Sequence, residues 1–314
     1  MKTRLLALTA LLGGAALALS GCSGSGTASA TSGGPVKVVA STNVYGDLVS
    51  SIGGDLVEVT SIIDSPDKDP HEYEATARDQ LAVSGATLVI ENGGGYDHFL
   101  DIMISAAGTE APVITATVIA GLEEVHDHAE KESEGGHEHA EFNEHVWYDL
   151  AAMKEVAGRI GDELAALDAD NAATYSANVA ALDERLDALI AREGELKGAL
   201  SGRLIAITEP VPLYLTDALG LTDATPQAFS EAVEEGTDVP AATLQETLAL
   251  FSGTSVDALI YNEQTEGAQT DAVLNAAKAA GIPTVGVTET LPEGDDYTGW
   301  MTANLDAIEG ALSP

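Results

Sequence analysis

Histidine and carboxylate side chains gather in one stretch of this sequence, between residues 123 and 145. Five of the 7 histidines in the chain fall there. The stretch has no apolar periodicity and contains a Gly pair, so it predicts a loop. Imidazole suits Zn, Cu and Ni, and the carboxylates add negative charge. We expect a set of weak, exchangeable metal sites in this loop, with a merely solvated acidic loop as the alternative. Four of these five histidines belong to the loop itself, namely His126, His128, His137 and His139.

Two histidines, one on each side of this loop, stand in more ordered surroundings. His71 follows Pro70 in the loop that leaves the second predicted strand, and His145 comes just before a predicted helix. Ligands of open α/β sheets collect outside the carboxyl ends of the strands, which is where the loop of His71 is expected. An isolated histidine in a loop is more often a surface residue, so neither residue alone indicates a site.

Strands and helices alternate along both halves of the chain, which indicates an α/β fold of two βα lobes with parallel sheets. The strands are expected at 36–40, 57–63, 87–91, 113–116, 204–208, 259–262 and 284–287. Between the two sets, the segment 170–197 predicts one helix of roughly 40 Å, long enough to join both lobes. Its apolar side chains recur at spacings of four and three residues, at Tyr175, Val179, Leu182, Leu186 and Leu189.

The N-terminal residues resemble a bacterial lipoprotein signal. Lys2 and Arg4 precede an apolar run that ends in Leu-Ser-Gly before Cys22, the only cysteine of the chain. In such signals the cysteine is acylated after cleavage, whereas a plain secretory signal with an incidental cysteine is the alternative. The domains expected on this basis are a signal peptide at 1–21, a Gly/Ser-rich tether at 22–35, a first lobe at 36–168 with the His-rich loop at 123–144, a linking helix at 169–200 and a second lobe at 201–314.

The charge balance of the chain excludes some partners. The 51 Asp and Glu residues oppose 13 Lys and Arg residues, for a formal net charge of −38. Such a surface repels nucleic acid and anionic lipid headgroups and attracts cations. With one cysteine there is no disulfide within the chain, so apolar packing must supply the core.

Several motifs, taken jointly, are similar to those of the zinc/manganese solute-binding proteins of ABC transporters. The resemblance runs from about Val36 to the C-terminus. It rests on the segments Ala40-Ser41-Thr42, Ile52-Gly53-Gly54-Asp55, Asp69-Pro70-His71-Glu72-Tyr73-Glu74, Glu144-His145-Val146-Trp147-Tyr148-Asp149 and 209–221. It implies one metal ion in the cleft between two lobes, which are joined by a long rigid helix.

The resemblance also implies the ligands of that ion, which fall on His71, His145, Glu209 and Glu289. Each lobe would supply two of them. Glu72 and Glu144 are candidates for orienting the imidazoles. Two departures from the family pattern stand beside these residues, at Pro210-Val211-Pro212 and at Asn143-Glu144.

The expected function is capture of a divalent ion, with zinc favoured by the His-rich loop and manganese as the alternative favoured by Glu209. The partners would be an ABC permease and its ATPase. The chain itself would be a monomer, lipid-anchored through Cys22 at the outer face of the cytoplasmic membrane.

Two other classes stay open, a zinc hydrolase and a surface adhesin. The chain has neither an H-E-x-x-H motif nor a G-x-S-x-G motif, and a fourth protein ligand would leave no place for an activated water. We therefore expect no enzymatic activity.

Overall fold

The computed structural model describes residues 34–66, 68, 70, 73–122, 142–253 and 256–313. Two four-stranded sheets, all of whose described pairings are parallel, organise this part of the chain. The expected fold class is thus confirmed. The expected signal peptide, Cys22 and most of the tether lie outside the described residues, and the domain divisions stay predictions. No helix of the described part is long and apolar enough to cross a membrane.

The first sheet has the strand order β2-β1-β3-β4. Its strands are β1 (Val36–Thr42), β2 (Val57–Ile63), β3 (Leu88–Glu91) and β4 (Val113–Thr115). Its helices are α1 (Asn43–Gly53), α2 (Ala77–Ser84), α3 (His98–Ala107), α4 (Ala116–Ile119) and α5 (Leu150–Leu167). β1 and β3 are buried almost throughout, which explains why their sequences are continuous apolar runs rather than alternating ones.

The second sheet has the equivalent order, β6-β5-β7-β8. Its strands are β5 (Leu204–Ile207), β6 (Thr222–Asp223), β7 (Ala258–Asn262) and β8 (Thr284–Val287). Its helices are α7 (Leu213–Ala218), α8 (Gln227–Glu234), α9 (Ala241–Ala249), α10 (Ala268–Ala280) and α11 (Tyr297–Leu312). In both sheets the strand order reverses between the first and third strands. Ligands of such sheets bind beyond the carboxyl ends at this point.

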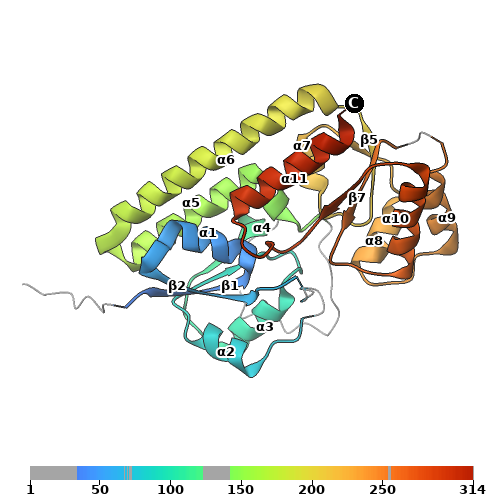
Figure 1. Ribbon diagram of the computed structural model, residues 1–314. Helices are drawn as coiled ribbons and strands as arrows, with labels where there is room; N and C mark the ends of the chain where they lie inside the picture. Colours follow the sequence, from blue (N-terminus) through green and yellow to red (C-terminus); the bar gives the residue numbers. More distant parts are fainter. Residues whose placement is uncertain are drawn as a thin grey trace, which may run out of the picture. The chain divides into compact units, whose positions relative to one another are not determined.

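Helix α6 (Ala172–Leu200) joins the two halves, as the periodicity predicts. It runs alongside α5 and α11 (Figure 1) and contacts α1 and α5 of the first half and α7 and α11 of the second. Its buried face includes Tyr175, Leu182, Leu186 and Leu189. These side chains belong to one apolar core that also takes in residues of both sheets, such as Leu88 and Ile207.

Hydrogen bonds between the first and second halves hold the segment that follows β8. Asn43 donates from Nδ2 to the Leu291 carbonyl at 2.8 Å and accepts from the Leu291 amide at 2.9 Å. Tyr148 Oη donates to the Thr288 carbonyl at 2.7 Å. Because Glu289 lies between these two anchors, its backbone is fixed from the first lobe as well as from its own.

Candidate metal site

His145 lies at the start of a single 3-10 turn (Val146–Tyr148) and is completely buried. Its Nδ1 stands 2.6 Å from Asn143 Oδ1. An amide oxygen only accepts hydrogen bonds, so Nδ1 carries the proton and Nε2 is the nitrogen that remains for other partners. The ring is flanked edge-on by Trp147, with ring centroids 5.0 Å apart. Asn143 and the aromatic neighbour together fix the direction in which Nε2 points.

Glu209 stands two residues after β5 and is 3% exposed. Its Oε2 has no hydrogen-bond partner within the described part of the chain. Burial and, after it, the charges of Glu234 and Glu289 raise the pKa of this carboxyl, while hydrogen bonds from Asn262 and Thr265 act in the opposite direction. A buried carboxylate oxygen without a partner is costly unless a cation or a proton reaches it.

Glu289 stands two residues after β8 and is 6% exposed. Asn262, the last residue of β7, donates from Nδ2 to Glu289 Oε1 at 2.7 Å. Gln264 Oε1 accepts the Glu289 amide at 2.7 Å and the Thr290 amide at 3.0 Å. The two expected carboxylates therefore meet beyond the carboxyl ends of β5, β7 and β8, with Asn262 linking their strands.

The charges of these groups act on one another. Burial by itself lowers the pKa of His145, but Glu234 and, more weakly, Glu144 and Glu289 raise it to about 9. The charge of Glu289, in the second lobe, thus raises the pKa of His145, in the first lobe. The structure thus places His145, Glu209 and Glu289 in one electrostatic environment. Among the described residues, however, no three His, Cys, Asp or Glu side chains form a set that could hold a metal ion.

The remaining expected residues are partly outside the described structure. His71 and Glu72 lie outside it, as do Cys22 and the loop histidines His126, His128, His137 and His139. Five residues before His71 in the sequence, the Pro66 carbonyl accepts a 3.1 Å hydrogen bond from Nε2 of Gln264, whose Oε1 accepts the Glu289 amide. Glu144 is 5% exposed. Its expected orienting role stays a prediction, since Nδ1 of His145 donates its hydrogen bond to the neighbouring residue, Asn143.

The structure brings Glu234, which the sequence reading did not single out, to His145. Glu234 Oε1 lies 3.1 Å from His145 Nε2, and the two side chains are 9% and 0% exposed. A cavity of about 590 Å³ lies beside this pair. It is lined by residues 142–144 of the first half and by residues of α7 and α8 and their flanking segments, among them Pro210, Glu231 and Glu234.

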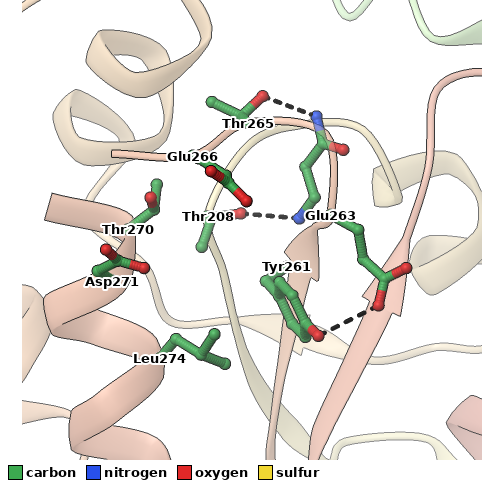
Figure 2. A pocket seen from close by; sticks show the side chains of 9 residues that line it. Thr208, Tyr261, Glu263, Thr265, Glu266, Thr270, Asp271 and Leu274 are labelled. Carbon is green, nitrogen blue, oxygen red and sulfur yellow. Dashed lines mark hydrogen bonds between the residues drawn. The ribbon is translucent and has the colours of Figure 1, made fainter. Parts of the chain in front are cut away.

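A second cavity, of about 360 Å³, is lined by Thr208, by residues of β7 and of the segment after it, and by residues of α10. Figure 2 shows its polar lining: Tyr261, Glu263 and Thr265 come from β7 and the loop after it, and Thr270 and Asp271 from α10. The cavity shares Asn262 with the candidate site. The carboxylates of this cavity are not among the expected ligands.

The sequence of the chain is similar to those of proteins of known family. A family model described as ZnuA, zinc-uptake complex component A, periplasmic, matches residues 38–311. The manganese ABC transporter substrate-binding lipoprotein PsaA of Streptococcus anginosus is 31% identical over 313 residues, covering 95% of each chain. PsaA of Streptococcus pneumoniae is 29% identical over 305 residues, covering 92% of this chain and 93% of its own.

Solved structures share the fold. The crystal structure of ZnuA aligns with a TM-score of 0.70 at 21% identity, covering 89% of this chain and all (100%) of that one. The periplasmic zinc-binding protein TroA of Treponema pallidum aligns with a TM-score of 0.72 at 21% identity, covering 90% and 100%. The two lobes with parallel sheets and the matched family define a substrate-binding protein, not an enzyme. The chain belongs to the ZnuA family of metal ABC transporter substrate-binding proteins, as its motifs indicate.

Proposed function

We propose that this chain captures one manganese ion outside the cytoplasmic membrane and delivers it to an ABC permease driven by an ATPase. The ligands are His145, Glu209 and Glu289 of the described structure together with His71. Acylated Cys22 tethers the chain to the outer face of the membrane. The observation that carries the proposal is the buried Glu209 carboxylate, whose Oε2 has no hydrogen-bond partner in the described part of the chain, in the same electrostatic environment as His145 and Glu289.

The position of Pro66 supports the inclusion of His71. The Pro66 carbonyl is bonded to Gln264, the side chain that fixes the Glu289 amide. His71 follows five residues later, a stretch that spans at most roughly 18 Å when fully extended. We take this chain length as support for His71 as a ligand beside the carboxylates of the second lobe.

Manganese is supported better than zinc by two observations. The similar lipoproteins of two streptococci are named for manganese. Carboxylate oxygens also suit the harder manganese ion, whereas imidazole suits zinc. Zinc remains the second candidate because of the His-rich segment, and it binds most sites of this kind more tightly than manganese does.

The proposal is tested by metal analysis and competitive Mn and Zn titration of the purified protein. We expect one tight equivalent in the wild type and a loss of at least about a hundredfold in affinity for Glu209→Ala and for His71→Ala, since each removes a ligand rather than a neighbour of one. Glu184→Ala, which removes an exposed carboxylate on α6, is the control. Tight binding retained in both ligand variants would refute the site.

A further inference from the structure

The core-facing stripe of the linking helix α6 contains one carboxyl group. The buried residues in the second half of this helix recur at spacings of four and three residues, at Leu182, Leu186, Leu189, Glu193, Leu196 and Leu200. A stripe with this spacing is normally apolar, because it packs on the core. Glu193 nevertheless occupies one of its positions, and only 8% of this residue is exposed.

Glu193 has no cation to balance its charge. Its Oε1 has no hydrogen-bond partner within the described part of the chain. The cations nearest to it in the sequence have other partners: Arg192 pairs with two carboxylates of α11, and Lys197 acts on Asp217 of α7. A buried carboxylate in this position is costly, whereas the protonated acid is much less so.

The groups that face Glu193 come from the turn before α5 and from α11. The charge of Asp149, in that turn, acts on Glu193. Tyr297 of α11 feels the charges of both acids, and its Oη donates to the Trp147 carbonyl at 2.6 Å. Acids on other elements that contact α6 face different charges, namely Arg185 and Asp296 for Asp47 of α1 and Lys197 for Asp217 of α7. Glu193 thus belongs to a buried cluster with Tyr297 and the turn of residues 147–149.

Asp149 cannot turn away from Glu193 without a loss of its own hydrogen bonds. It caps α5, where its Oδ1 accepts the Ala151 amide at 3.0 Å and the Ala152 amide at 3.1 Å. Burial and, after it, the charge of Asp149 raise the pKa of Glu193 to about 7. The neutral acid fits this position, whereas the carboxylate gains hydration only when α6 and the turn separate. Separation should therefore become more frequent as the pH rises through about 7.

We propose that Glu193 forms a pH-sensitive contact between the linking helix and the turn before α5, closed while its carboxyl is protonated and opening more often once it is ionised. This inference requires no bound metal and does not depend on the function proposed above. His145 stands at the start of the 3-10 turn that leads to Asp149. The contact therefore sets how firmly the segment that carries this histidine is held.

The test is hydrogen exchange of the metal-free protein in excess chelator, measured at pH 5.5 and pH 8 on peptides that cover residues 146–153. For each peptide, the rate in the wild type divided by the rate in Glu193→Gln cancels the intrinsic pH dependence of exchange. We expect this ratio to rise at least about tenfold from pH 5.5 to pH 8. Glu195→Gln is the matched control, because it removes an exposed carboxylate from the same helix. Its ratio should stay within about twofold.

Asp149→Asn tests the partner of Glu193, since Asn also caps helices well but has no charge. In this background the rise caused by Glu193 should be smaller than in the wild type, and it should persist because burial is the larger cause. The measurement compares Asp149→Asn with the double variant Asp149→Asn/Glu193→Gln at both pH values. A rise equal to that in the wild type would overturn the role of Asp149.

An unchanged ratio for residues 146–153 would overturn the inference. Urea below the unfolding transition separates local opening from global unfolding, because local opening exposes little surface and hardly depends on urea. If the pH-dependent exchange accelerates with urea as steeply as that of the most protected amides of α10, Glu193 acts only on global stability and the proposed contact is wrong. If Glu193→Gln does not fold, Glu193→Leu, which continues the apolar stripe, supplies the comparison.

Discussion

Asn143 makes the hydrogen bonds that fix His145, so its replacement by Ala should affect both metal binding and stability. Asn143 Oδ1 lies 2.6 Å from His145 Nδ1 and accepts the His145 amide at 3.2 Å. Its Nδ2 donates to the Pro210 carbonyl at 3.1 Å, next to Glu209. One side chain thus orients the imidazole of the first lobe and holds the backbone beside a carboxylate of the second.

The magnitude follows from these contacts. Loss of a group that orients a ligating histidine typically costs about 10–100-fold in metal affinity. Each lost hydrogen bond costs about 0.5–1.5 kcal/mol. Because Asn143 lines the cavity, water can replace part of what is removed, and we expect a loss of about 1–3 kcal/mol in the free energy of unfolding for Asn143→Ala.

Asn143→Asp separates the two roles. An Asp keeps an acceptor for Nδ1 and increases the basicity of the imidazole, so metal affinity should equal or exceed that of the wild type. It loses the donor to the Pro210 carbonyl, so the free energy of unfolding should still fall, by about 1 kcal/mol. Affinity then follows the order Asp ≥ Asn > Ala, while stability is highest for Asn.

The assay is chelator competition with manganese and zinc, beside denaturant unfolding in excess chelator so that bound metal does not add to the stability. Asn275→Ala is the control, because Asn275 is exposed on α10. If Asn143→Ala binds both metals within twofold of the wild type, Asn143 does not orient His145 for a metal, and our reasoning about the Nε2-directed site is wrong.

Two predictions concern the scaffold. Burial and, after it, Asp149 raise the pKa of Glu193 to about 7 from 4.5; this acid therefore favours folding below pH 4.5, and the benefit is lost as the pH rises to about 7. In the wild type the free energy of unfolding should therefore fall between pH 5 and 8, and Glu193→Gln should make this fall smaller by about 1–2 kcal/mol after solvent screening. Denaturant titrations of both proteins at the two pH values measure the fall, and an equal fall in both would contradict the prediction. A Cβ at Gly161 of α5 would lie 2.4 Å from Val179 Cγ2 of α6, so Gly161→Ala should cost about 1–3 kcal/mol despite the better helix propensity of Ala. Adding Val179→Ala should remove more than half of that cost in a double-mutant cycle, and strict additivity would show that the two helices do not meet closely there.

The strands were predictable because fully buried parallel strands leave a strong signal. β2 and β8 have the expected bounds, and β1, β5 and β7 differ by one or two residues. The long helix α6 was predictable from its recurring apolar residues. The common strand order of the two sheets was not, because which strands pair is decided by crossover connections and not by local sequence.

Glu234 contacts His145, but the sequence alone could not predict this contact. Signals for α8 exist: Pro226 stands at its start, Gly236 follows its end, and Phe229 and Val233 are spaced for one apolar face. Those signals predict a short helix but do not say which of its carboxylates, Glu231 or Glu234, meets His145. That choice depends on how α8 packs on its sheet, and residues 145 and 234 are far apart in sequence.

Replacing a buried carboxylate of the site and replacing Asn143 should have opposite effects on the stability of the metal-free protein. A buried carboxylate near other carboxylates destabilises the folded chain until a cation arrives. Replacing Glu209 by Gln should therefore raise metal-free stability while lowering affinity, a trade-off typical of functional sites. Asn143 satisfies hydrogen bonds in the metal-free chain, so its replacement by Ala should lower both. Metal at 100 times its dissociation constant adds about 2.7 kcal/mol to the wild type, and only variants of ligands should gain stability without metal while losing part of this increment.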